Sequence, residues 1–157
     1  MLLDTHAHYD DEAFDADRDV LLEDLKEYGI RKVINAGASV ESSYTGLKLA
    51  ERYPWVYAAL GAHPNYVEEL NETVLKDFAE LTKHPKVVAI GEIGLEYHYE
   101  KPPRDVQKIW FRRQLDLAAE TGLPVIIHSR EAAQDTFDEM QRAAARGIGG
   151  VIHCFSS

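Results

Sequence analysis

The chain has 157 residues, of which 45% are hydrophobic and 28% are charged, and its formal net charge is −10. This length suits one globular domain, and the acidic balance excludes a protein that tracks nucleic acid along a basic stripe. A polyanionic substrate whose phosphates contact bound metal ions stays possible. The single cysteine, Cys154, excludes an intrachain disulfide, and no segment approaches the roughly 18 apolar residues of a membrane span. We therefore expect a soluble, cytoplasmic protein with no membrane contact.

Short apolar segments alternate with segments of helical periodicity along the whole chain. In chain order, the pattern predicts strand 2–8, helix 17–28, strand 30–36, a helix from Ser39 or Ser42 to Tyr53, strand 55–60, helix 67–83, strand 86–90, a helix opened by Pro103 and ending at Thr121, strand 124–127, helix 131–146 and strand 149–152. Several of these strands are almost entirely apolar, as strands buried on both faces are. Strict alternation of strand and helix predicts an α/β fold with a parallel sheet.

The first predicted strand carries two histidines two positions apart, His6 and His8. Because side chains in a strand repeat every two residues, both project from one face. Imidazole is a common ligand of zinc and other first-row divalent metals, and Asp4 is a candidate third member of that face. Alone, a His-x-His pair is as compatible with two ordinary loop histidines as with a metal site.

Other polar residues fall where later strands are predicted to end. His63 follows the third strand, Glu92 follows the fourth, and His128 and His153 end the fifth and sixth. In a parallel α/β barrel these carboxyl ends converge on one mouth, where active sites are built. Any one of these histidines is readily explained by burial, but the set favours a metal-dependent active site. Mixed imidazole and carboxylate donors suit zinc, manganese or magnesium.

Five motifs occur in order along the chain. They are Asp4-Thr5-His6-Ala7-His8, Gly61-Ala62-His63-Pro64, Gly91-Glu92-Ile93-Gly94-Leu95-Glu96-Tyr97-His98, Pro124-Val125-Ile126-Ile127-His128-Ser129-Arg130-Glu131 and His153-Cys154-Phe155-Ser156. Together they resemble the TatD-related metal-dependent deoxyribonuclease family, which belongs to the amidohydrolase-like hydrolases. The resemblance implies a TIM-barrel-type fold, two divalent metal ions, and exonucleolytic hydrolysis of phosphodiester bonds with DNA as the substrate.

The resemblance also implies a role for each matched residue. His6 and His8 resemble the pair that binds the first metal ion, Glu92 the carboxylate that bridges both ions, and His128 and His153 the ligands of the second ion. A shared carboxylate of this kind holds two cations about 3.5–4 Å apart, where they contact both the attacking and the leaving oxygen.

Two further residues are expected to contact the substrate. His63 resembles a catalytic residue of the family that contacts a phosphate oxygen and lies outside the set of metal ligands. Arg130 is a candidate phosphate contact because guanidinium matches phosphate geometry. A solvated or ion-paired arginine at the start of a helix explains Arg130 equally well.

The family pattern is incomplete in this sequence. The family barrel has eight βα units in roughly 250 residues, and six are predicted here. The aspartate that ends strand eight of the family, and completes its first metal site, has no counterpart. Ser157 stands where the family has glycine, and Glu96 where it has aspartate. We therefore expect residues 1–157 to form one hydrolase domain, a partial barrel truncated after strand six.

A partial barrel leaves two open sheet edges, which invite pairing with another chain. Three interpretations follow: a piece of a longer enzyme whose missing C-terminal segment covers the edges, a truncated protein that covers them by self-association or with a partner, or a family member that binds metal without hydrolysing DNA. Two functions besides the nuclease also stay open. One is hydrolysis of a small amide or ester by an amidohydrolase-type site. Amidohydrolases often carry a carboxylated lysine on strand four, and Glu92 at this place favours the nuclease. The other is a non-catalytic metal-binding fragment.

Overall fold

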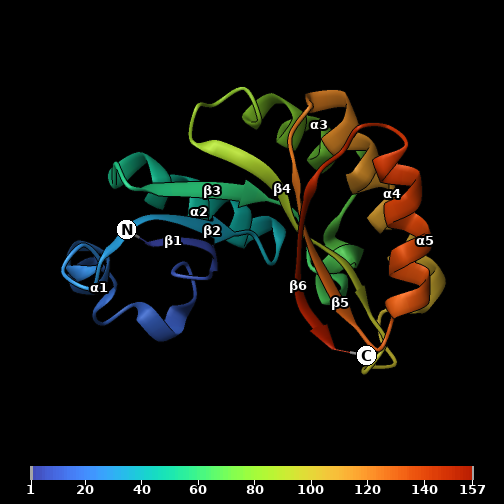
Figure 1. Cartoon of the computed structure of the whole chain (residues 1–157), viewed down its shortest axis with the longest axis horizontal. Coiled ribbons are helices and arrows are strands. Elements are labelled where there is room, and N and C mark those ends of the chain that lie inside the picture. Colours follow the sequence, from blue (N-terminus) through green and yellow to red (C-terminus); the bar gives the residue numbers. More distant parts are fainter. Residues whose placement is uncertain (1, 157) are drawn as a thin grey trace.

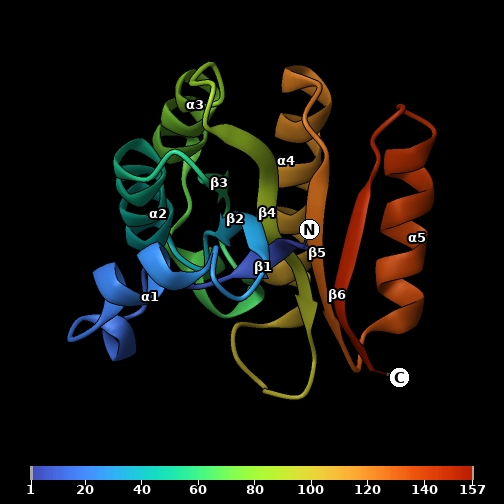
Figure 2. The same ribbon diagram turned by 60° about the vertical axis from the view of Figure 1, so that its left-hand side comes forward.

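The computed structural model describes residues 2–156, and their side chains as far as His153. One sheet of six parallel strands contains β1 (Leu2–Ala7), β2 (Ile30–Ala36), β3 (Val56–Leu60), β4 (Val87–Glu96), β5 (Val125–Arg130) and β6 (Gly150–Ser156), paired in that order. The helices are α1 (Arg18–Asp24), α2 (Val40–Arg52), α3 (Glu72–Leu81), α4 (Arg104–Thr121) and α5 (Ala133–Ala144), with 3-10 turns η1 (Glu12–Phe14) and η2 (Pro64–Glu69). Figures 1 and 2 show a curved sheet with helices along its outer side. The expected partial barrel of six βα units is confirmed.

The main core lies between the sheet and these helices, and the strands supply much of it. Leu60, Ile90 and Ile93 are completely buried, as is Phe111 of α4. Burial of each such side chain stabilises the fold by about 1.5–3 kcal/mol. This packing fixes the strands, and through them the residues at their carboxyl ends.

Local signals place several helix ends where the sequence predicts them. Of the two candidate caps of α2, Ser39 is the one used, because its Oγ accepts the Ser42 N–H at 3.0 Å. Gly122 ends α4 in the left-handed region, with φ of 72°. Pro103, expected in the first turn of α4, instead occupies the N-cap position one residue earlier.

Several predicted boundaries are wrong. The helix expected over 17–28 ends at Asp24, and the strands expected over 124–127 and 149–152 continue to Arg130 and Ser156, so that His128 and His153 lie inside β5 and β6 and not at their ends.

Two further differences have clear local causes. The helix expected over 67–83 starts late, because Asn71 Oδ1 accepts the N–H groups of Thr73 and Val74 and so begins α3 at Glu72. The strand expected over 86–90 continues to Glu96, because its second half pairs with β5. Glu92 therefore lies inside β4, and not after its end.

The sheet has the two edges that six strands imply, β1 and β6. Both expose apolar side chains: Leu2 and Leu3 are 60% and 55% exposed, and Val151 and Ile152 are 46% and 39% exposed. Such edges are templates for further pairing. Within the described part of the chain, every helix is too short or too polar to cross a membrane. Ser157 lies outside the described residues.

Candidate metal centre

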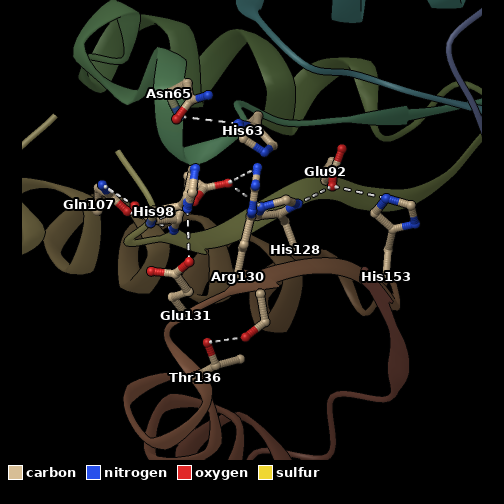
Figure 3. Close-up of polar contacts among 12 residues, drawn as sticks. His63, Asn65, Glu92, His98, Gln107, His128, Arg130, Glu131, Thr136 and His153 are labelled. Atoms are coloured by element: carbon tan, nitrogen blue, oxygen red, sulfur yellow. Dashed lines mark hydrogen bonds and ion pairs between the residues drawn. The ribbon is translucent and has the colours of Figure 1, made fainter. Parts of the chain in front are cut away.

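The carboxylate of Glu92 lies at the centre of a histidine cluster and is almost completely buried. Its Oε2 is 3.3 Å from His6 Nε2 and 3.5 Å from His8 Nε2. Its Oε1 is 2.9 Å from His128 Nδ1 and faces His153, whose Nε2 is 4.0 Å away (Figure 3). Each carboxylate oxygen thus faces a different pair of histidines.

The charge on Glu92 is set by opposing effects. Burial alone raises the pKa of this carboxyl, but hydrogen bonds from three histidines outweigh the burial and hold its pKa well below the usual range. Glu92 is therefore ionised at neutral pH. An ionised carboxylate surrounded by imidazole nitrogens is a donor set that suits a divalent cation.

His6 and His8 approach each other as the two-residue spacing predicts. Their Nε2 atoms are 3.0 Å apart, and His8 Nδ1 is 3.0 Å from the carbonyl oxygen of Ala36. Because a carbonyl only accepts, His8 Nδ1 carries a proton, and its Nε2 offers a lone pair in the neutral tautomer. Among the residues that the structure describes, the buried His6 Nδ1 has no hydrogen-bond partner. The nitrogens that these two rings direct at Glu92 and at each other are therefore both Nε2.

Asp4, the candidate third member of this face, is turned elsewhere. Its Oδ1 accepts the backbone N–H of His6 at 3.0 Å. It belongs to neither of the histidine and carboxylate groups described below.

His128 lies between two buried carboxylates. Its Nδ1 faces Glu92, and its Nε2 is 3.1 Å from Oε2 of Glu96. Burial lowers the pKa of His128, but the hydrogen bonds to both carboxylates raise it above the ordinary value. A carboxylate on one imidazole nitrogen orients the ring and increases the basicity of the other nitrogen. Glu96, noted from the sequence only as a departure from the family, thus orients a predicted metal ligand.

His63 sits just after β3, with its ring 4.2 Å from that of His128. Burial, and then the nearby His128, lower the pKa of His63 to about 4, so its imidazole is neutral at pH 7. Its Nδ1 accepts the N–H of Asn65 at 3.2 Å, which places the remaining proton on Nε2. Nε2 is then a hydrogen-bond donor, which suits a phosphate oxygen.

Two sets of three residues bring one potential ligand atom each to within 4.8 Å of one another in the described chain. The first is His6, His8 and Glu92, and the second is His63, Glu92 and His128. His153 lies outside both sets, but its ring stacks on that of His6 with centroids 3.7 Å apart and an interplanar angle of 8°. Glu92 belongs to both sets, as the bridging carboxylate predicted from the resemblance would.

Arg130 does not line the main cavity of the site. Its Nη1 is 3.9 Å from Glu96 Oε2, and its guanidinium lies 5.6 Å from the ring centre of Tyr99. It is therefore held by an ion pair at the rim of the site, a position compatible with either interpretation of this residue.

The site also has an acidic wall that was not predicted from the sequence. A cavity of about 590 Å³ is lined by His8, His63, Glu92, His128 and His153, and also by Asp10, Asp11, Glu41 and Glu69. Asp10 accepts hydrogen bonds from Asn35 and Ser42, which fix it beside β2 and α2. The run of acidic residues just after His8 was the signal that could have revealed it. This wall favours cations and repels a phosphate that is not neutralised by them.

The parallel sheet, with histidines and a buried carboxylate gathered at its carboxyl ends, defines a barrel protein with a candidate metal centre. Residues 3–157 match the family described as TatD related DNase. The chain belongs to this family, as the five motifs indicate.

The chain is 40% identical over 156 residues to the uncharacterized metal-dependent hydrolase YabD of Bacillus subtilis, covering 99% of this chain and 61% of YabD. It is 34% identical over 144 residues to the 3'-5' ssDNA/RNA exonuclease TatD of a Rahnella species, covering 91% of this chain and 55% of that protein. The crystal structure of YjjV, a TatD homologue from Escherichia coli, superposes with a TM-score of 0.90 at 34% identity, covering 99% of this chain and 61% of YjjV. The chain thus spans about three fifths of the length of these relatives.

Proposed function

We propose that the protein hydrolyses phosphodiester bonds at the ends of DNA strands with two divalent metal ions bound at this centre. One observation carries the proposal. The two oxygens of Glu92 face different histidine groups, Oε2 toward His6 and His8 and Oε1 toward His128. A carboxylate placed in this way can hold two cations at the spacing that two-metal phosphodiester hydrolysis uses.

In this proposal each metal ion has a defined set of donor residues. His6 and His8 hold the first ion and His128 and His153 the second, with Glu92 shared between them. When bound, two such cations supply the Lewis acidity and the positive charge that phosphodiester hydrolysis requires. Zinc, manganese and magnesium all suit this mixed donor set. The positive charge also offsets the acidic wall that would otherwise repel DNA.

The remaining residues act on the substrate. His63 Nε2 donates to a phosphate oxygen, because burial and the nearby His128 keep the ring neutral and the Asn65 N–H occupies its Nδ1. Arg130 contacts a second phosphate from the rim. The Rahnella relative is named as a 3'-5' exonuclease of single-stranded DNA and RNA, which supports a single-stranded substrate.

The test begins with metal content, measured by elemental mass spectrometry after gel filtration. We expect about two divalent ions per chain for the wild type and close to none for Glu92→Gln, since one residue serves both ions. His63→Ala should keep the metal and lower kcat on a 3'-labelled single-stranded oligonucleotide on the order of 10²-fold. His84→Ala, a histidine 3.6 Å from Glu51 and outside the cluster, is the matched control and should change neither quantity.

Each alternative has its own outcome. If His63→Ala removes the metal, His63 is a ligand and its assignment to the substrate is wrong. Turnover of a small amide or ester in place of the oligonucleotide would support the amidohydrolase interpretation. Bound metal without turnover of either would show a non-catalytic fragment. The elution volume in gel filtration reports whether the chain associates with a second copy, as its open edges β1 and β6 would allow.

A further inference from the structure

Two glutamines of α4, Gln107 and Gln114, are completely buried. They lie about two helical turns apart and therefore on the same face of the helix. A buried primary amide is costly unless its donors and acceptor are all satisfied. Gln107 satisfies its acceptor and both its donors, and Gln114 its acceptor and one donor, with main-chain groups of the segments that carry the candidate metal centre.

Gln107 binds both main-chain groups of Glu96. Its Oε1 accepts the Glu96 N–H at 2.9 Å, and its Nε2 donates to the Glu96 carbonyl at 2.9 Å. The second N–H of the amide donates to the carbonyl of Pro102 at 2.8 Å. Gln107 therefore pairs with Glu96 as a neighbouring strand would, and it ties the following loop to the same point. Figure 3 shows it at the end of β4.

Gln114 makes the same pair of contacts with Ala62. Its Oε1 accepts the Ala62 N–H at 2.8 Å, and its Nε2 donates to the Ala62 carbonyl at 3.2 Å. Ala62 is the residue immediately before His63. The two glutamines thus bind residues at the ends of β3 and β4 by identical chemistry.

The sheet itself explains why such contacts are needed. The register between β3 and β4 runs from Ala58–Val87 to Leu60–Ile90. Beyond that point β4 pairs with β5, and Glu96 lies opposite Arg130. Where the two strands separate, main-chain groups facing α4 need other partners, and buried groups left unpaired cost about 1–3 kcal/mol each.

We propose that Gln107 and Gln114 are positioning residues of the metal centre, which set the places of His128 and His63 respectively. Gln107 acts through Glu96, whose carboxylate is 3.1 Å from His128 Nε2. Gln114 acts through Ala62, which fixes the start of the segment that holds His63 beside the His128 ring. The inference rests on the proposed metal centre for its consequence, but the positioning itself is a property of the metal-free chain.

The test replaces each amide by a thioether of similar size, in Gln107→Met and Gln114→Met. The control is Lys86→Met, at the opposite end of β4, which removes three hydrogen bonds from Lys86 Nζ to backbone carbonyls. Three quantities are measured for each variant. The first is the hydrogen exchange of the Glu96 and Ala62 amides, and the second is the imidazole nitrogen resonances of His63 and His128. Both are measured in the metal-free chain. The third is the affinity for Mn²⁺, measured by calorimetry.

Gln107→Met should accelerate exchange at Glu96, shift the His128 resonances and weaken Mn²⁺ binding about 10- to 100-fold, the usual effect of losing a residue that orients a metal ligand. Gln114→Met should accelerate exchange at Ala62 and shift the His63 resonances more than those of His128. Lys86→Met should accelerate exchange at Glu96 and Ala62 only as much as at other core amides, because its effect is on global stability. It should leave the His63 and His128 resonances unchanged and alter Mn²⁺ affinity less than about twofold.

Two results would overturn the proposal. One is unchanged exchange and unchanged histidine resonances in both glutamine variants. The other is a loss of Mn²⁺ affinity in Gln107→Met no greater than in Lys86→Met, which would reduce the glutamine to a general stabilising role. A wild type that binds no Mn²⁺ refutes the proposed function instead, and the metal-free exchange and resonance shifts then decide the positioning role alone.

Discussion

Gly94 marks a close approach of β4 and β5, and Gly94→Ala tests this approach directly. The residue has φ of 145°, a backbone conformation that L side chains rarely adopt. It pairs with His128 across the two strands. A Cβ at this position would lie 2.0 Å from the His128 carbonyl oxygen and 3.0 Å from its backbone nitrogen. Both neighbours are main-chain atoms, so no side-chain rotation relieves the contact.

The expected cost combines two terms. A non-glycine residue in a disfavoured backbone region costs about 1–3 kcal/mol, and overpacking of a tight interior costs about 1–3 kcal/mol more. We therefore expect Gly94→Ala to lower the free energy of unfolding by about 4 kcal/mol, a large part of the 5–15 kcal/mol typical of a domain. Because Glu92 and Glu96 flank Gly94 and His128 lies opposite, metal binding should fall with stability.

The assay is equilibrium unfolding in urea, followed by circular dichroism and compared at constant m-value. Gly122→Ala is the matched control, because Gly122 also has positive φ, of 72°, but a Cβ there meets nothing within 4 Å. It should cost about 1 kcal/mol, from backbone strain alone. If Gly94→Ala costs no more than Gly122→Ala, the two strands do not approach as closely as described, and the reasoning fails.

Three further predictions concern stability away from the centre. Lys86→Met should destabilise by about 2 kcal/mol in urea, because Lys86 Nζ donates to three carbonyl oxygens at 2.8–3.1 Å. Asn71→Ala should cost about 1 kcal/mol through loss of the α3 cap, measured in the same way. The hydrogen bonds from Arg112 lower the pKa of Glu139, so this carboxylate stabilises the fold above its unfolded pKa near 4.5 and loses that effect as pH falls through the lower folded value. Arg112→Met should therefore flatten the dependence of unfolding free energy on pH in that acidic range.

Each of these predictions has a control and a contrary result. Lys86→Arg is the control for Lys86→Met, because it keeps the charge but not the compact three-donor geometry. Full stability in Lys86→Met would show that the three contacts contribute nothing. Asn71→Asp retains the cap and should match the wild type within a few tenths of a kcal/mol. An acid unfolding profile for Arg112→Met that parallels the wild type would mean that Glu139 titrates normally in the folded protein.

Much of the fold could be predicted from periodicity, because apolar strands and capped helices have local sequence signals. The convergence of His6 and His8 followed from the two-residue repeat of a strand, and the structure places their Nε2 atoms 3.0 Å apart. The gathering of His63, Glu92, His128 and His153 followed from the parallel topology. Their roles as ligands and substrate contacts stay predictions, since geometry alone assigns no metal.

Other features depended on tertiary contacts that periodicity does not encode. The strand expected over 86–90 looked finished at Gly91, but pairing of the next residues with β5 extends it to Glu96. The contact of Glu96 with His128 joins residues 32 positions apart and depends on strand register. The start of α3 was missed because η2 buries Val67 in a separate turn before Asn71 begins the helix.

The stacked rings of His6 and His153 connect the two outermost strands of the sheet. His6 belongs to β1 and His153 to β6, and their centroids are 3.7 Å apart although four strands separate them in the pairing order. Ions bound by these rings and by Glu92 would connect β1 to β6. Because the ligands come together only when the sheet is curved, ion binding and sheet curvature are linked thermodynamically. A flatter sheet would separate the ligands of β1 and β6, and bound ions would oppose that flattening. The ion concentration around the protein would then govern its shape as well as its chemistry.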